Sequence, residues 1–250
     1  MRYLKDLIFL KRVSRMSNTK QLIKELIAKD NYTFNDLCNL VSVLRSDDGC
    51  PWDREQTNKS IRNSIIDETY EFIEGLDDNN DGLMCEELGD VLFQIIFHSD
   101  IKSDNEAFDI NDVINGICKK MILRHPHVFG DVSVSSSSDV LVNWENIKNS
   151  EKQRKTPYEQ LDSVSKALPS LMRAQKLISK AEKNNLVEKS DLSAALNGIK
   201  KTLEDVEKTE NVHFLGKLLF DVSALCRVMD VEAEEILYIE NNKFINQFKD

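Results

Sequence analysis

Residues 65–97 read I-I-D-E-T-Y-E-F-I-E-G-L, D-D-N-N-D-G and L-M-C-E-E-L-G-D-V-L-F-Q-I-I-F, and this stretch decides the predicted fold. Two helical patterns are joined by a polar turn, and each helix carries two acids three residues apart. The pairs are Glu68 with Glu71 and Glu87 with Asp90. Because residues three apart share a helix face, an antiparallel hairpin would bring all four acids together. Clustered carboxylates repel one another unless cations lie between them, so the pattern predicts a divalent metal site.

The second helix places its acids between apolar surfaces. At about 100° per residue, its polar stripe is flanked on both sides by apolar sectors. The stripe consists of Glu87, Asp90, Gln94 and His98. The simpler alternative is a pair of amphipathic helices with ordinary surface acids. Two acidic pairs with apolar borders favour a functional site over that alternative.

The turn between the helices has a second interpretation. Asp77, Asn79, Asp81 and Gly82 match the first half of an EF-hand calcium loop. Such a loop needs a bidentate glutamate at its twelfth position, where this chain has Leu88. We therefore expect a solvated turn between two helices rather than a calcium site.

Composition limits the fold and the partners. The chain has 250 residues, 41% hydrophobic and 30% charged, with only 8 glycines and 4 prolines, and this composition favours an all-α globular protein. A net charge of −10 argues against general binding to nucleic acid or to an anionic membrane, and no apolar run is long enough to span a bilayer. Five dispersed cysteines without a C-x-x-C pair are typical of reduced thiols in a cytoplasmic protein.

Residues 1–17 are expected to be an extension outside the folded part. Their first fifteen residues are basic and amphipathic, which is compatible with an organelle transit peptide. Met16 as the true start of the protein is the alternative.

Helical patterns continue on both sides of the central stretch. Residues 18–44 predict two helices with a break near residues 30–33, the second capped by Thr33 or Asn35. A further helix should begin at Asp109 or Asn111 and stop at Pro126. The serine-rich residues 133–139 are expected to form a linker, followed by a helix that opens near Trp144.

Several side chains outside the acidic stretch are candidates for binding a substrate. Lys120 and Arg124 lie four apart near the end of a predicted helix, where they can complement the helix dipole or bind phosphate. Trp52, in a polar loop, can cover the edge of the core or stack on a base. His125 and His127 flank Pro126 and are expected to form a hydrogen-bonded turn rather than a metal site.

The last third of the chain repeats the apolar frame of the central stretch. L-G-D-V-L-F-Q-I at residues 88–95 returns as L-G-K-L-L-F-D-V at residues 215–222. In this register the four acids correspond to Thr202, Asp205, Phe214 and Lys217. A lysine can supply positive charge but cannot ligate a cation, so the second copy should be a helical partner without metal chemistry.

Five segments of the chain form a distinctive set of motifs. They are G-C-P-W-D-R-E-Q-T (49–57), D-E-T-Y-E (67–71), E-E-L-G-D-V-L-F-Q (86–94), R-H-P-H-V-F-G-D (124–131) and W-E-N-I-K-N-S-E-K (144–152). Together they resemble the MazG family of nucleoside triphosphate pyrophosphohydrolases, within the all-α NTP pyrophosphatase superfamily. L-P-S-L-M-R-A-Q-K at residues 168–176 also looks like the segment that joins the family's two repeats. The resemblance is dense from about Asn35 to Lys176 and weaker afterwards.

The resemblance implies a fold of two related, four-helix-bundle-like repeats. The first would be a MazG-like domain with an intact metal site at residues 18–155, and the second a degenerate repeat at residues 156–250. A homodimer is expected, since hairpins with apolar residues on two sides need a partner. Asp67, where the family usually has glutamate, is a mild departure.

The resemblance also implies an activity and its residues. Glu68, Glu71, Glu87 and Asp90 would hold Mg²⁺, with Mn²⁺ as a possible substitute, and would form the catalytic centre. Lys120, Arg124, Trp144 and Lys148 would approach the nucleotide. The expected reaction is cleavage of an NTP or dNTP to the monophosphate and pyrophosphate, as in cleaning of the nucleotide pool. The alternative is a catalytically silent helical scaffold that binds nucleotide or a partner, which the eroded second repeat would suit.

Overall fold

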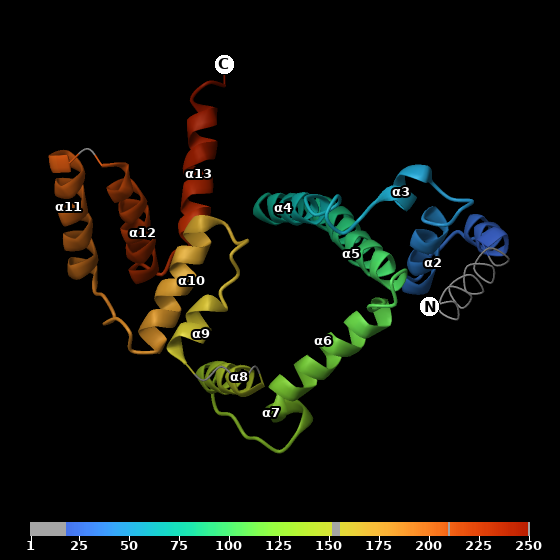
Figure 1. Ribbon diagram of the computed structural model, residues 1–250, viewed down its shortest axis with the longest axis horizontal. Helices are drawn as coiled ribbons and strands as arrows, with labels where there is room; N and C mark the ends of the chain where they lie inside the picture. The colour runs from blue at the N-terminus through green and yellow to red at the C-terminus, as the bar shows by residue number, and fades with distance from the viewer. Residues whose placement is uncertain (1–18, 152–155, 210, 250) are drawn as a thin grey trace, which may run out of the picture. The chain divides into compact units, whose positions relative to one another are not determined.

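The computed structural model describes residues 19–151, 156–209 and 211–249 (Figure 1). The predicted extension at residues 1–17 lies outside this part of the chain. Contacts divide the protein into two compact units, Met1–Val132 (unit 1) and Ser133–Asp250 (unit 2). Helices are the only regular elements in the described residues, which confirms the all-α prediction. The boundary predicted at residue 155 concerns sequence repeats and stays a prediction.

The helices of unit 1 have the caps that the sequence predicts. Residues 19–27 are helical, and Thr33 caps the next helix by accepting a hydrogen bond from the backbone N–H of Asp36. Asp109 caps α6 in the same way, paired with Asp112 in a capping box. The further helices are α2 (Phe34–Leu44), α3 (Pro51–Glu55), α4 (Ser64–Asp77), α5 (Asp81–Ser103), α6 (Ile110–Arg124) and α7 (Pro126–Phe129).

Helices α4 and α5 pack against each other as the predicted hairpin. Asn80 caps α5 by accepting from the backbone N–H of Leu83 at 3.2 Å, and Asn79 takes a left-handed conformation with φ of 50°. Gly75 lets the helices approach closely, because a Cβ there would lie 3.0 Å from the backbone nitrogen of Met84. Residues 81–88 are already helical, so the segment is a helix-to-helix turn and not a calcium loop.

The core of unit 1 lies around the second half of α5. Val41 of α2 and Ile61, in the turn before α4, pack with three apolar residues of α5. These are Ile96, Phe97 and Ile101, all less than 10% exposed. The hairpin is thus anchored where α5 is apolar, and its acids lie toward the other end of α5, near the turn.

Unit 2 contains a second helical hairpin, formed by α11 and α12, with α10 against α12 and α13. Gln175 of α10 joins the start of α13: its Nε2 donates to Val231 O at 2.8 Å, and its Oε1 accepts from Ala233 N at 2.9 Å. No helix in the described ranges has the length and apolarity needed to cross a membrane. The helices are α8 (Ser137–Glu151), α9 (Pro157–Asp162), α10 (Ser170–Lys183), α11 (Leu192–Thr209), α12 (Val212–Val228) and α13 (Ala233–Asn246).

The predicted linker at residues 133–139 is wrong in its second half, because α8 begins at Ser137 rather than near Trp144. Ser136 and Asp139 cause this early start. The Ser136 hydroxyl accepts from the backbone N–H of Asp139 at 3.2 Å, and the Asp139 carboxylate accepts from Ser135. The serines therefore act as a helix N-cap, which is a common role of serine that composition alone conceals.

Candidate metal centre

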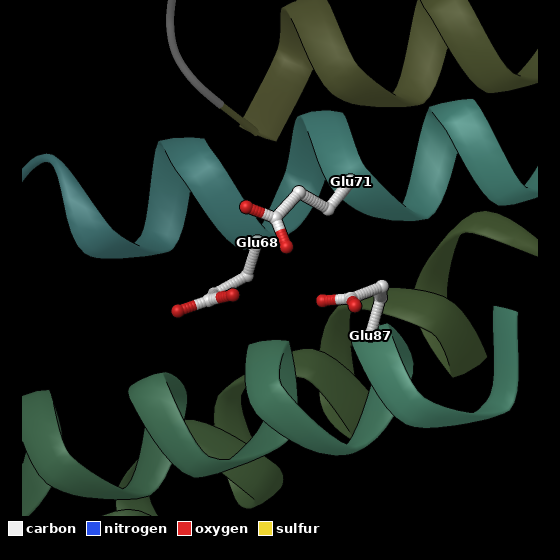
Figure 2. A group of neighbouring side chains, drawn as sticks. All are labelled: Glu68, Glu71 and Glu87. Carbon is white, nitrogen blue, oxygen red and sulfur yellow. The ribbon is translucent and has the colours of Figure 1, made fainter. Parts of the chain in front are cut away.

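Three acids of the hairpin come together between α4 and α5. One carboxylate oxygen each of Glu68, Glu71 and Glu87 lies within 4.8 Å of the other two. Figure 2 shows the three side chains directed into the space between the two helices. Within the described ranges, this is the only group of three or more His, Cys, Asp or Glu side chains whose ligand atoms are so close. We call Glu68, Glu71 and Glu87 the acidic seam.

Glu87 is the member of the seam that most needs a partner. It is only 5% exposed, and its Oε2 has no hydrogen-bond partner in the described part of the chain. An unpaired buried carboxylate is costly, and buried charges are normally paired or bound to metal. Oxygen-only donors that carry full charge suit a hard divalent cation such as Mg²⁺ or Mn²⁺. The seam therefore fits the cation that the sequence predicts.

Two acids of the seam, Glu87 and Glu68, resist ionisation. Burial raises the pKa of Glu87, and the charges of Glu71, Asp90 and Glu68 raise it further. Burial also raises the pKa of Glu68, and the negative charges of Asp90 and Glu71 raise it further. A bound cation would reverse this balance by favouring the ionised forms.

Asp90 lies one turn beyond Glu87 on α5 and is exposed. It is not among the three acids whose oxygens converge. Its charge nonetheless raises the pKa values of both Glu68 and Glu87, so it lies within electrostatic reach of the seam. Its role as a fourth ligand stays a prediction.

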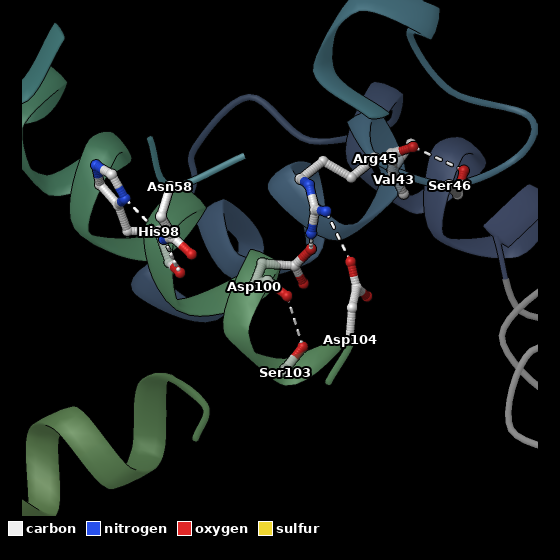
Figure 3. A network of polar contacts seen from close by, with 8 residues as sticks. All are labelled: Val43, Arg45, Ser46, Asn58, His98, Asp100, Ser103 and Asp104. Atoms are coloured by element: carbon white, nitrogen blue, oxygen red, sulfur yellow. Dashed lines mark hydrogen bonds and ion pairs between the residues drawn. The ribbon is translucent and has the colours of Figure 1, made fainter. Parts of the chain in front are cut away.

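The far end of the polar stripe makes a contact that sequence reasoning missed (Figure 3). Asn58, in the turn before α4, bonds to His98 of α5 at the ring Nδ1 (2.8 Å) and at the main-chain oxygen (3.0 Å). The two residues are 40 positions apart, and no local pattern pairs them.

A second polar contact lies close by on α5. Arg45, the C-cap residue of α2, donates to Asp100 and, at 2.7 Å, to Asp104 (Figure 3). Its guanidinium lies 5.6 Å from the centre of the Phe97 ring. The acids near the end of α5 are thus paired with an arginine. Glu87, the acid of the seam near the start of the same helix, has no such pairing among the contacts of the described residues.

The other candidates in unit 1 differ in exposure. Arg124 is buried at the end of α6, Lys120 is half-buried one turn earlier, and Trp52 on α3 is 62% exposed. His125 Nδ1 donates to Met121 O at 2.6 Å, as expected for a hydrogen-bonded turn, while His127 Nδ1 is buried without a partner in the described residues. Substrate binding by Lys120, Arg124 and Trp52 stays a prediction.

Trp144 and Lys148 belong to α8, in unit 2. Lys148 donates to Glu145 at 3.2 Å, and Lys180 lies 3.7 Å from the same carboxylate. Trp144 and Lys148 are both half-buried. Their predicted approach to a nucleotide is untested by this geometry.

The second hairpin arranges its polar residues differently from the first. Thr202 of α11 is 1% exposed and donates to Asp221 of α12 at 2.6 Å. Lys217 pairs with the same carboxylate at 2.5 Å. Lys217 occupies the position that corresponds to Asp90, so an ammonium stands where the first hairpin has an acid. Thr202 and Lys217 therefore provide the Asp221 carboxylate with a hydrogen bond and a positive charge from within the same chain.

Comparisons with known proteins identify a family that matches the segment containing the seam. The sequence model of one family, described as the MazG nucleotide pyrophosphohydrolase domain, matches residues 56–129, which include the whole α4–α5 hairpin. The chain is 36% identical over 220 residues to the nucleoside triphosphate pyrophosphohydrolase/pyrophosphatase MazG of Thermotoga maritima, covering 86% of this chain and 84% of that protein. It is 33% identical over 229 residues to the nucleoside triphosphate pyrophosphohydrolase of Escherichia coli K12, covering 86% of this chain and 87% of that protein.

A third relative shares only part of its length. The uncharacterized protein YabN of Bacillus subtilis is 47% identical over 146 residues, which are 58% of this chain but 30% of YabN. The two relatives that match over most of their length carry the decisive information. Together with the family match over the seam, they show that the chain belongs to the MazG nucleotide pyrophosphohydrolase family.

Proposed function

We propose that this protein is a Mg²⁺-dependent pyrophosphohydrolase that cleaves nucleoside or deoxynucleoside triphosphates into the monophosphate and pyrophosphate. The main support is the buried Oε2 of Glu87, which has no hydrogen-bond partner among the described residues and lies beside Glu68 and Glu71 in the segment that the family model matches. The names of the Thermotoga and Escherichia relatives specify the same class of substrate.

The seam would hold the cation through Glu68, Glu71 and Glu87, with Asp90 as the fourth ligand. When bound, Mg²⁺ supplies positive charge for the phosphate oxygens and lowers the pKa of a bound water. Mn²⁺ has similar ligand preferences and should substitute.

The chain's own groups would complete the reaction. One seam carboxylate accepts a proton from the water that attacks the α-phosphorus, and the bond from that phosphorus to the bridging oxygen breaks as pyrophosphate leaves. Lys120, Arg124 and Lys148 would neutralise the phosphate charge, since the rest of the chain is acidic. Trp52 and Trp144 would stack on the base or cover it.

We also propose a homodimer in the cytoplasm. Ile66, Tyr70 and Ile73 follow i, i+4 and i+7 spacing on α4 and are 41%, 50% and 38% exposed, so they form an apolar stripe that a second copy can cover. All five cysteines are free thiols, which suits a reducing compartment. Light scattering of the full chain at micromolar concentration tests the dimer, and a monomeric mass would contradict it.

Hydrolysis in ¹⁸O-labelled water tests the reaction. Full-length protein, Mg²⁺ and a panel of NTPs and dNTPs should give monophosphate and pyrophosphate, with the label in the monophosphate because the attack is on the α-phosphorus. Label in the pyrophosphate would place the attack on the β-phosphorus. Release of a nucleoside diphosphate and inorganic phosphate, or a rate unchanged in Glu68→Gln, would overturn the proposal.

A further inference from the structure

The contact between Asn58 and His98 lies at the open end of the α4–α5 hairpin. The amide nitrogen of Asn58 carries two hydrogens and meets two acceptors of one residue, the ring Nδ1 at 2.8 Å and the main-chain oxygen at 3.0 Å. The main-chain oxygen only accepts, so it identifies the nearby Asn58 atom as the NH₂ nitrogen. His98 Nδ1 must then accept as well, and the ring is neutral with its hydrogen on Nε2. Burial also lowers the pKa of His98, which favours this neutral form.

The start of α4 is held mainly by the turn that precedes it. Asn63, at the N-cap position, makes no side-chain capping bond. The turn is built by reciprocal bonds: Thr57 N donates to Ser60 Oγ at 2.9 Å, and Ser60 N donates to Thr57 Oγ1 at 3.1 Å. Asn58 belongs to this turn and joins it directly to α5. At its other end, α4 is joined to α5 by the chain itself, through residues 78–80.

Part of the seam lies near the open end of the hairpin. Glu68 is the fifth residue of α4, so it lies only about 6 Å along the helix from its start. His98 follows Glu87 by eleven residues, which is about three turns, so both lie on the same side of α5. Movement of the start of α4 would therefore shift Glu68 relative to Glu87.

We propose that Asn58 and His98 are positioning residues, whose hydrogen bonds hold Glu68 and Glu71 of α4 opposite Glu87 of α5. Neither residue contacts the cation in this proposal. The proposal rests on the proposed function only where the cation is concerned, because the placement of α4 against α5 can be measured without metal.

Three substitutions of His98 separate positioning from a general loss of packing. His98→Leu removes the acceptor and should weaken Mn²⁺ binding about 10- to 100-fold, as loss of an outer-shell contact does. His98→Asn places an amide oxygen near the former Nδ1 and should retain most of the affinity. His98→Gln places its polar atoms near the former Nε2 and should not rescue. Asn58→Leu also removes the bond to the main-chain oxygen, so it should weaken binding at least as much as His98→Leu, and the double variant should be no worse than Asn58→Leu alone.

The measurements are Mn²⁺ titration by electron paramagnetic resonance, with metal alone, and hydrogen exchange of residues 64–71 without metal. His98→Leu should exchange faster there than the native protein. The matched control is Asp104→Asn, which removes the negative charge of the 2.7 Å pair with Arg45, six residues after His98 and at the C-cap of α5. It should lower thermal stability without changing Mn²⁺ affinity or exchange in α4.

Two results would overturn positioning: native Mn²⁺ affinity and native exchange in His98→Leu, or rescue by His98→Gln but not by His98→Asn. Equal losses in His98→Leu and Asp104→Asn would likewise show that the contact only stabilises the fold. Absence of Mn²⁺ binding by the native protein would instead refute the cation in the proposed function, and the exchange data would still decide the positioning.

Discussion

The α4–α5 and α11–α12 hairpins share an apolar frame but balance their charges in different ways. In the first, Glu68, Glu71 and Glu87 converge, and one oxygen of the buried Glu87 has no described partner. In the second, Asp221 accepts from Thr202 and pairs with Lys217. The same helical frame therefore supports unbalanced negative charge in the first hairpin and a carboxylate neutralised by a lysine in the second. What distinguishes a candidate metal site from a structural repeat is the few polar residues on the facing sides of the helices.

Replacing one acid in each hairpin should give the largest contrast. Glu87→Gln should lower pyrophosphate release about 100-fold or more, since even outer-shell changes at metal sites cost about 10- to 100-fold. Asp221→Asn, the matched change on α12, should stay within about twofold of the native rate. Both rates would be measured at saturating NTP and Mg²⁺. Similar losses in the two variants would abolish the functional distinction between the hairpins.

Metal binding should stabilise the protein through the first hairpin. A ligand at 100 times its Kd adds about 2.7 kcal/mol to the unfolding free energy. Mn²⁺ should therefore raise the Tm of the native protein and of Lys217→Ala, but not of Glu87→Gln. Calorimetry with metal alone measures the shift, and a full shift in Glu87→Gln would place the cation elsewhere.

Without metal, Glu87→Gln should be more stable than the native protein at pH 7. The pKa values of Glu87 and Glu68 are raised in the folded protein, so their protonated forms favour folding. Their contribution to the free energy of unfolding is complete below the unfolded-state pKa of about 4.3 and is lost as the pH rises through the folded-state pKa values. The gain in Tm should therefore shrink as the pH falls toward 4. Thermal scans in chelator across this range measure it, and a gap that widened at low pH would refute the assignment.

Thr202→Val should weaken the second hairpin by about 1–2 kcal/mol, because a buried hydrogen bond to a carboxylate is lost. Urea denaturation would be followed by the fluorescence of Trp144 in a Trp52→Phe background, so that the signal comes from unit 2. Unchanged stability would mean that the ion pair with Lys217 is sufficient to stabilise the Asp221 carboxylate.

Lys217→Met should have the smallest effect, about 0.3–0.5 kcal/mol. Lys217 is half exposed and pairs with Asp221 at i,i+4, and exposed pairs of this type are weak. The same urea experiment measures it. A loss above that of Thr202→Val would make the lysine, and not the threonine, the main stabiliser of the second hairpin.

Local sequence signals predicted much of the helical framework. Thr33 and Asp109 are helix caps because their short side chains can accept from the backbone three residues later, and this depends on nearby residues alone. The hairpin followed from helical periodicity and the turn at residues 77–82. The same kind of local chemistry also caused the error at α8, because Ser136 can begin a helix as readily as it can occupy a linker.

Long-range contacts could not be predicted in the same way. The acids of the seam were expected to meet because each pair has its own spacing, but the burial of Glu87 depends on how two helices pack. Asn58 and His98 are 40 residues apart, and neither the spacing nor the composition relates them. Sequence resemblance alone connected Trp144 and Lys148 with a substrate, and their contribution awaits direct measurement.

The buried oxygen of Glu87, unpaired within the described part of the chain, also connects the protein's lifetime to the supply of metal. If the seam binds a divalent cation as proposed, the metal-free chain spends a larger fraction of time unfolded than the loaded chain. Unfolded molecules are the ones that proteases remove, so modest losses of stability can change abundance several-fold. A cell starved of the cation would then lose this protein by degradation as well as by inactivity.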